Sequence, residues 1–207
     1  MYNVDLLGLI ALICIWTLLL INQVLMVAGY FYYVKETHAE EKELSYYPKI
    51  SILVPAHNEA KVIVKTVESL LQLTYPSDRY EIIIINDNSS DNSRDLLENI
   101  MLKNPDRALK VLNTDNITGG KGKSNALNIG YRESNGEYIV VYDADNTPEQ
   151  DALKYLVAEI ESDDELAVVI GKFRTRNRDV NLLTRFINIE TLSFQWMAQA
   201  GRWQLFK

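Results

Sequence analysis

The chain alternates between apolar runs and polar segments, and its first apolar run is by far the longest. This run extends from Leu6 to Val34 and is interrupted only by Thr17, Asn22, Gln23 and small residues. Since a helix needs roughly 20 apolar residues to span a bilayer, we predict one tilted transmembrane helix within an anchor of residues 1–35. A buried helix of a soluble protein is the simpler alternative.

Basic residues flank only one end of this run. No Lys or Arg precedes it, whereas Lys35, Lys42 and Lys49 follow it. A cleaved signal peptide fits worse, because it begins with positive charges, has a shorter apolar stretch and ends at a small-residue cleavage site. The positive-inside rule then predicts a single-pass protein of the cell membrane, with lipid around the anchor and the soluble domain in the cytoplasm.

After a charged linker at residues 36–48, short apolar runs and amphipathic stretches alternate. Strands are predicted at Lys49–Val54, Tyr80–Ile85, Leu109–Leu112, Tyr138–Tyr142 and Leu166–Ile170, and helices at Lys61–Leu71, Leu96–Met101, Lys123–Arg132 and near Glu149–Glu161. Four consecutive isoleucines in the second strand indicate a strand covered on both faces. The alternation predicts an open, doubly wound α/β sheet, mostly parallel, in a domain of residues 49–171.

Composition narrows the class of ligand. The 207 residues have a formal net charge of -7, and the pI is near 4.9, so a nucleic-acid partner is not expected. A phosphate-containing ligand would need a metal ion as a bridge in so acidic a chain. The single cysteine, Cys14, excludes a disulfide within the chain.

Polar and glycine residues follow each of the first four predicted strands. These segments are Pro55–Glu59, Asp87–Asp91, Gly119–Asn128 and Asp143–Asp145. Ligands of open α/β sheets bind outside the carboxyl ends of the strands. The coincidence of suitable residues at four strand ends therefore predicts a single binding crevice.

Asp143 and Asp145 are the sharpest candidates for metal ligands. Residues two apart on an extended segment point the same way and can share one hard divalent cation. Oxygen ligands favour Mg²⁺ or Mn²⁺ over zinc, and such a cation would stabilise the charge on a departing nucleoside diphosphate. A solvated turn is the simpler alternative.

The glycine-rich segment suits a phosphate group. Gly119, Gly120 and Gly122 allow the backbone to approach phosphate closely, and Lys121 and Lys123 add positive charge. The segment is not a P-loop, because the first glycine of that motif is missing and the loop follows the third strand. No G-x-G-x-x-G follows the first strand, which argues against a dinucleotide-binding fold.

Together these segments resemble the motifs of family 2 glycosyltransferases, of the membrane-embedded kind that includes cellulose, chitin and hyaluronan synthases. The family's P-x-x-N-E, D-x-S-x-D, K-x-x-A-L-N and D-x-D correspond to Pro55–Glu59, Asp87–Asp91, Lys123–Asn128 and Asp143–Asp145. The resemblance implies a GT-A fold and sugar transfer from a nucleotide sugar, usually UDP-linked, to a polysaccharide or lipid acceptor. Asn86 departs from the pattern, because many members carry an aspartate there.

The resemblance also implies roles for individual residues. Those implied in nucleotide-sugar binding are Pro55, Asn58, Glu59, Asp87, Lys123 and Asp143. Within this set Asp87 would contact the nucleobase, usually uracil, and Asp143 the ribose and metal region. Asp145 would ligate the Mg²⁺ or Mn²⁺ cofactor.

The acidic motif that supplies the acceptor-activating base in the family is not found in this chain. Glu190 lies in a helical pattern, and packing or solvation explains it adequately. Gln199–Trp203 spells the Q-x-x-R-W of processive members, but it follows the nucleotide half too directly, and we interpret the match as coincidence.

Residues 172–207 are predicted to form a basic strand and an amphipathic helix. Arg174, Arg176 and Arg178 alternate with polar residues, and apolar residues recur at helical spacing from Phe186 to Met197. This helix would lie at the membrane interface or pack against an acceptor-binding half.

Because no helix stop signal precedes Lys207, the sequence is expected to be truncated after its nucleotide-sugar-binding half. Two functions follow. The first is a glycosyltransferase whose acceptor-activating base comes from a C-terminal half or a second chain. The second is a non-catalytic membrane protein that binds sugar nucleotide or acts as an interaction remnant, and sugar transfer separates the two.

Overall fold

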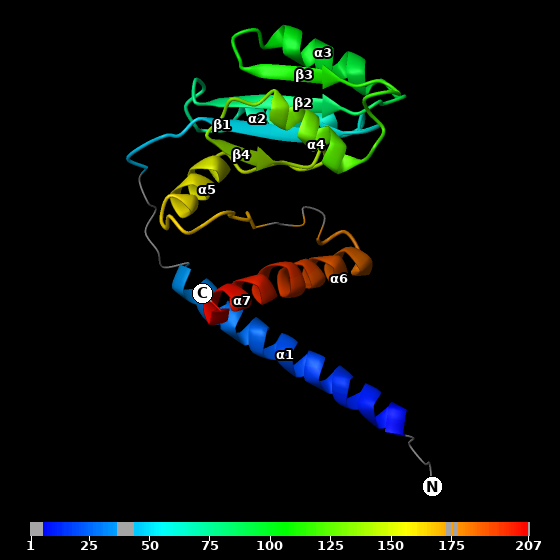
Figure 1. Cartoon of the computed structure of the whole chain (residues 1–207), viewed down its shortest axis with the longest axis vertical. Helices are drawn as coiled ribbons and strands as arrows, with labels where there is room; N and C mark the ends of the chain where they lie inside the picture. Colours follow the sequence, from blue (N-terminus) through cyan, green and yellow to red (C-terminus); the bar gives the residue numbers. More distant parts are fainter. Residues whose placement is uncertain (1–5, 37–43, 173–174, 176–177, 207) are drawn as a thin grey trace. The chain divides into compact units, whose positions relative to one another are not determined.

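The computed structural model describes residues 6–36, 44–172, 175 and 178–206. The chain divides into two compact units, one of residues 42–170 and one that combines residues 1–41 with residues 171–207 (Figure 1). The first unit holds the α/β domain, and the second is helical.

The α/β unit contains alternating strands and helices, as the apolar pattern predicts. In chain order these are β1 (Ile50–Ala56), α2 (Ile63–Leu71), β2 (Tyr80–Asn86), α3 (Ser93–Lys103), β3 (Leu109–Asn113), α4 (Lys123–Arg132), β4 (Tyr138–Val141) and α5 (Ala152–Ile160). The predicted bounds hold to within three residues.

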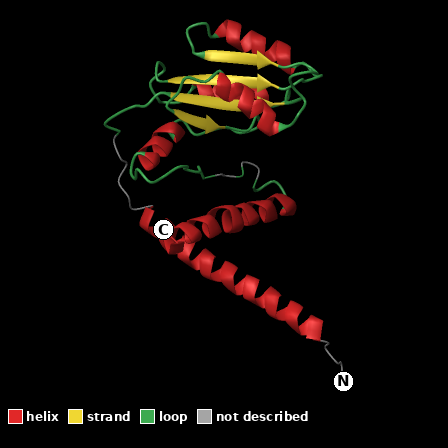
Figure 2. Ribbon diagram, in the orientation of Figure 1, coloured by secondary structure: helices red, strands yellow, loops and turns green. Residues whose placement is uncertain are grey.

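The four strands form one parallel sheet in the order β3-β2-β1-β4 (Figure 2). Ile50 of β1 lies opposite Tyr80 of β2 and Tyr138 of β4, so the strands are in register at their amino ends. β2 and β3 lie on one side of β1, and β4 lies on the other side. The order in which strands are added to the sheet therefore changes side at β1, although all strands stay parallel. All carboxyl ends therefore meet at one edge, next to the point where open α/β sheets bind ligands.

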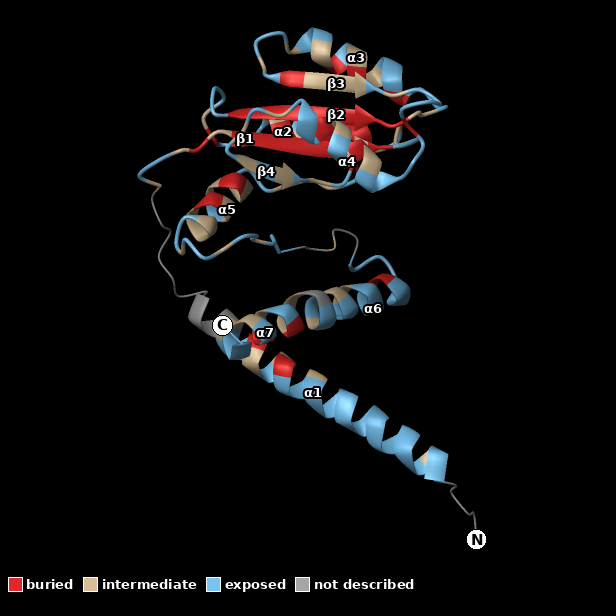
Figure 3. Ribbon diagram, in the orientation of Figure 1, coloured by how far each residue is buried: buried red, intermediate tan, exposed pale blue. Residues whose placement is uncertain are grey.

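Both faces of the central strands are buried, which confirms the prediction from the isoleucine run (Figure 3). Ile82 and Ile84 belong to a cluster with residues of α2, α3 and α5, while Ile83 and Ile85 pack with Ala126 of α4 on the other face. Successive strand residues point to opposite faces, so one unbroken apolar run can serve both layers. Burying each such side chain contributes about 1.5–3 kcal/mol.

The fifth predicted strand, Leu166–Ile170, is wrong. These residues follow α5 without entering the sheet, and Val168 and Ile170 are 72% and 66% exposed. A β-branched run becomes a strand only when a neighbouring strand completes its hydrogen bonds. In the described part of the chain β4 is one of the two edge strands, and no segment pairs with its outer side.

The helical unit contains α1 (Leu6–Glu36), which is long and apolar enough between Leu6 and Tyr32 to cross a membrane. α6 (Leu182–Glu190), the π-helical stretch η1 (Thr191–Met197) and α7 (Ala198–Phe206) follow one another without interruption. Residues 182–206 are therefore helical where the sequence predicts an amphipathic helix. The expected basic strand falls partly on residues 173, 174, 176 and 177, outside the described residues, and the neighbouring described residues are not strand.

A buried carboxylate joins the strands at the amino edge of the sheet. Glu81 of β2 is 5% exposed and accepts hydrogen bonds from Ser51 Oγ and from the backbone N–H of Asn135, both at 2.7 Å. Lys110 of β3 forms an ion pair with it at 3.1 Å. Burial alone would raise the pKa of Glu81, but these three partners outweigh it and hold the pKa below the ordinary value of 4.5.

We expect Glu81→Gln to destabilise the fold by about 1.5–3 kcal/mol near pH 7, because it weakens hydrogen bonds to a buried charge. A lowered folded-state pKa means that the carboxylate stabilises the fold above the unfolded-state value and loses this effect as pH falls through the folded-state value. The difference in Tm between the wild type and Glu81→Gln should therefore shrink below pH 4.5. Thermal unfolding of the detergent-solubilised chain, followed by near-ultraviolet circular dichroism, measures this.

The matched control is Glu68→Gln on the exposed side of α2, for which we expect little change in Tm at any pH. A Tm difference for Glu81→Gln that stays constant with pH would contradict the proposed role of the charge.

Candidate functional site

A cleft of about 550 Å³ opens at the carboxyl edge of the sheet, and all four strand-end segments line it. Its lining residues are Pro55, Ala56, His57, Glu59, Asp87, Gly120, Gly122, Lys123, Ala126, Asp143, Ala144 and Asp145. Every residue proposed from the sequence for the nucleotide sugar or the metal is among them except Asn58. Parallel pairing of β1 with β2 and β4 brings these segments together.

Asp87 is the most buried acid of the cleft, at 6% exposure. Its backbone N–H donates to the carbonyl of Ala56 at 2.7 Å, which continues the β1–β2 pairing into the loops. Its Oδ1 accepts hydrogen bonds from Thr114 Oγ1 and from the backbone N–H of Gly120, both at 2.9 Å. One carboxylate oxygen of Asp87 thus fixes the glycine-rich loop.

This arrangement requires a glycine at position 119. A Cβ atom on Gly119 would lie 1.9 Å from Thr114 Oγ1 and 2.5 Å from Asp87 Oδ1, much too close for any side chain. The next glycine, Gly120, has a φ of 68° and Gly122 a φ of 93°, a region that L side chains rarely adopt. The sequence predicts that these glycines let the backbone approach a phosphate. What Gly119 approaches in the structure is Thr114 and Asp87, and the sequence did not indicate Thr114 as a partner.

Asn58 connects the loops after β1 and β2. Its Oδ1 accepts from the backbone N–H of Ser90 at 2.8 Å and of Asp91 at 3.3 Å, so its Nδ2 is the group that faces His57 Nε2 at 3.0 Å. Because Nε2 then accepts, His57 donates from Nδ1 to the carbonyl oxygen of Asp87 at 2.6 Å. Asn58 and His57 therefore set the position of Asp87 in the cleft wall.

Asp143 and Asp145 both line the cleft, but they lie in a turn and not on an extended segment. The backbone N–H of Asn146 donates to the carbonyl of Asp143 at 3.0 Å and closes this turn. Between the two acids, the carbonyl of buried Ala144 accepts from Thr66 Oγ1 of α2 at 2.7 Å. The two carboxylates share the cleft because α2 holds the turn, and not because of strand alternation.

Lys123, the first residue of α4, forms an ion pair with Asp143 across the cleft. Both side chains are about half exposed, at 56% and 52%, so ligands can reach them. The described residues contain no cluster of three acidic, histidine or cysteine side chains that could hold a metal by themselves. Two carboxylates suit a Mg²⁺ or Mn²⁺ ion whose remaining ligands are substrate phosphates and water.

The model of the family described as glycosyl transferase family 2 matches residues 51–206, which is most of the chain. The chain belongs to glycosyl transferase family 2. This family 2 chain is 48% identical over 204 residues to a probable glycosyltransferase, YdaM, of Bacillus subtilis (strain 168), covering 96% of the chain and 47% of that protein. It is 35% identical over 144 residues to poly-beta-1,6-N-acetyl-D-glucosamine synthase of Staphylococcus epidermidis, covering 70% of the chain and 33% of the synthase.

A solved structure shows the same fold. The mannosyltransferase PcManGT from Pyrobaculum calidifontis, in complex with GDP-Man and Mn²⁺, superposes with a TM-score of 0.56 at 24% identity, covering 77% of this chain and 48% of that one. The likeness at this identity concerns the fold alone, and it confirms the expected GT-A architecture. The family 2 chain spans less than half the length of each of these three proteins.

We expect Thr114→Val to loosen the glycine-rich loop, because it removes one of the two donors to Asp87 Oδ1. A hydrogen bond to a charged group contributes about 1.5–3 kcal/mol, so the amide of Gly120 should exchange roughly ten times faster or more. Hydrogen exchange with mass spectrometry of the peptide covering residues 115–123 measures this.

Thr114→Ser is the control, since it keeps the hydroxyl and should keep the protection of the loop. Equal exchange in Thr114→Val and Thr114→Ser would mean that the hydroxyl does not hold the loop.

Proposed function

We propose that the cleft is the donor site of a glycosyltransferase and binds a UDP-linked sugar with Mg²⁺ or Mn²⁺. One observation carries this proposal: in a chain of family 2, an acid at the end of β2 and two acids after β4 face one cleft beside a glycine-rich loop. The names of the comparison proteins support it, because one is a poly-beta-1,6-N-acetyl-D-glucosamine synthase and another was solved with GDP-Man and Mn²⁺.

In this proposal Asp87 recognises the nucleobase. The hydrogen bonds that its side chain accepts from Thr114 and Gly120 both go to Oδ1. Its Oδ2 can then accept from the N3–H of a uracil, which has a donor at that position. Pro55 and Glu59 supply the neighbouring wall on the β1 side.

Lys123 and the amino end of α4 are suited to the diphosphate. The lysine adds a positive charge where the helix dipole already favours an anion, and the glycines before it leave the backbone accessible. Asp143 pairs with Lys123 in this structure, so donor binding would redistribute that ion pair, with the lysine turning to phosphate. Asp143 and Asp145 would hold the cation, which when bound neutralises the charge on the departing nucleoside diphosphate.

The acceptor side is outside this cleft in our proposal. A polysaccharide or lipid hydroxyl needs a base to remove its proton, and none of the cleft residues is assigned that role. We infer that a C-terminal half or a second chain supplies it. Donor binding without transfer is the alternative function for the chain by itself.

We expect the detergent-solubilised chain to bind UDP in the presence of Mn²⁺, and Asp145→Ala to weaken this binding at least about tenfold, because it removes one of two carboxylates available to the cation. Isothermal titration calorimetry with UDP and Mn²⁺ measures it. Asp106→Ala, which removes an exposed acid in the loop between α3 and β3, is the control and should bind like the wild type. Absence of heat for the wild type with either Mn²⁺ or Mg²⁺ would refute the proposed donor site.

We expect Asp87→Asn to lower the affinity for UDP by about ten- to a hundredfold. Asparagine has only one acceptor oxygen, and an NH₂ donor replaces the second carboxylate oxygen that would accept from the uracil. Asparagine can still accept from Thr114 and Gly120 through Oδ1, so the loop should remain in place. Binding of inorganic pyrophosphate with Mn²⁺ should therefore change little. If Asp87→Asn weakened UDP and pyrophosphate equally, Asp87 would act on the loop and not on the base.

A further inference from the structure

The helical unit contains a contact in which two helices approach to backbone distance. A Cβ atom on Gly29 of α1 would lie 2.0 Å from the carbonyl oxygen of Met197, and one on Gly201 of α7 would lie 1.9 Å from the carbonyl oxygen of Leu25. Leu25 and Ala198 are buried beside these glycines. Each helix thus places a glycine against the backbone of the other, which is how closely packed membrane helices meet.

This contact lies near one end of the apolar span of α1. Leu25 and Gly29 both fall within Leu6–Tyr32, and the aromatic residues Tyr30 and Phe31 follow directly. Tyrosine and tryptophan gather where a bilayer meets water. If α1 crosses the membrane as predicted, α7 is docked at the depth of the lipid headgroups and the upper acyl chains.

We propose that the helix formed by residues 182–206, which we call the C-terminal helix, is embedded in the surface of an anionic lipid bilayer while docked on α1. The inference rests on the predicted anchor, and it is independent of the donor site. In this proposal lipid covers the C-terminal helix. Finding that a protein segment covers it would overturn the proposal.

The first reason is the apolar surface of the C-terminal helix. Its ionisable residues are only Arg185, Glu190 and Arg202. Its exposed apolar side chains are Leu182, Leu183, Phe186, Ile187, Ile189, Leu192, Phe194, Leu205 and Phe206. Most large apolar side chains of α1 are exposed as well, so one apolar solvent can cover both helices.

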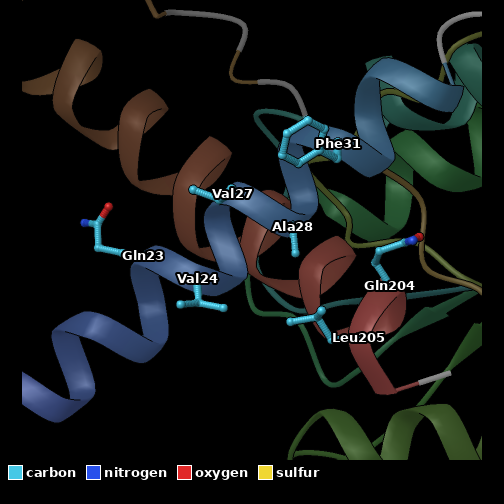
Figure 4. Close-up of a pocket in the computed structure, with 7 residues that line it drawn as sticks. All are labelled: Gln23, Val24, Val27, Ala28, Phe31, Gln204 and Leu205. Carbon is cyan, nitrogen blue, oxygen red and sulfur yellow. The ribbon is translucent and has the colours of Figure 1, made fainter.

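The second reason is a groove between the two helices. It has a volume of about 510 Å³ and is lined by Val24, Val27, Ala28 and Phe31 of α1 and by Leu205 of α7, with Gln23 and Gln204 (Figure 4). The groove is almost wholly apolar and lies along the predicted span. Such a surface fits lipid acyl chains, which carry no hydrogen-bonding groups.

The third reason is the distribution of charge. Residues 171–207 contain seven basic and two acidic residues, a net charge of +5, so the other residues of this chain of net charge -7 carry -12. Lys172 lies 3.9 Å from the ring centroid of Trp196. A segment rich in basic residues that directly precedes an apolar helix in the sequence is attracted to anionic headgroups, by about 1 kcal/mol for each basic residue near the surface.

Tryptophan fluorescence can test this, because the chain has tryptophan only at positions 16, 196 and 203. Trp16→Phe leaves the two reporters of the C-terminal helix. In nanodiscs that contain about one third phosphatidylglycerol, we expect quenching by lipids brominated near the headgroup end of the acyl chain. Bromine near the methyl end should quench less, because an interfacial helix is shallow.

Gly201→Leu should lower this quenching about twofold or more, because its side chain cannot fit against the carbonyl of Leu25. Gln199→Leu adds the same side chain at an exposed position of α7 and should keep the quenching. The double variant Trp196→Phe, Trp203→Phe reports on Trp16 in α1, and we expect strong quenching by bromine near the methyl end.

Each contrary result has a distinct meaning. If Trp16 were not quenched, the anchor prediction and this inference would both be wrong. If Trp16 were quenched while Trp196 and Trp203 responded only to aqueous acrylamide, the C-terminal helix would be solvated. If these two tryptophans responded to neither quencher, protein would cover the helix. UDP binding can be measured on the same nanodiscs and does not depend on where the C-terminal helix lies. A failure of the proposed donor site would therefore be recognised independently of the quenching results.

Discussion

The parallel pairing of β1 with β2 is the constraint on which the cleft at the carboxyl edge of the sheet depends. Both strands are buried, and their hydrogen bonding continues beyond the sheet, where the backbone N–H of Asp87 donates to the carbonyl of Ala56. Because the strands are parallel and in register, the segments that follow them leave the sheet at the same edge. Burial of apolar side chains on both faces stabilises the sheet, and the sheet in turn holds the polar loops close enough together to contact one ligand.

Short polar side chains then fix the loops relative to one another. Asn58 accepts from the loop after β2, Thr114 and Gly120 donate to Asp87, and Thr66 holds the turn between the two aspartates after β4. Each of these bonds joins segments that are far apart in sequence. A cleft built in this way is organised before a ligand arrives, which lowers the entropy lost on binding.

The helical unit uses a different physical device. Its helices meet through glycines, at a distance where packing and not burial of large side chains provides the attraction. With the contact made by glycines, large apolar side chains of α6, η1 and α7 remain exposed. The π-helical stretch Thr191–Met197 lies in the middle of this segment, and its last residue, Met197, contacts Gly29 of α1. An outward apolar surface is unfavourable in water but favourable in lipid.

The sequence by itself determined the α/β class, the parallel sheet and most element bounds, because a strand buried on both faces leaves an unbroken apolar run in the sequence. It also indicated the residues of the cleft, because polar and glycine residues follow directly after each of these runs. It could not exclude a strand at Leu166–Ile170, since a strand exists only with a partner that completes its ladder. Nor could it find Thr114 and Thr66, whose hydroxyls act on residues 27 and 78 positions away. Tertiary structure alone decided these contacts, because hydrogen bonds between distant loops leave no periodic signal in the chain.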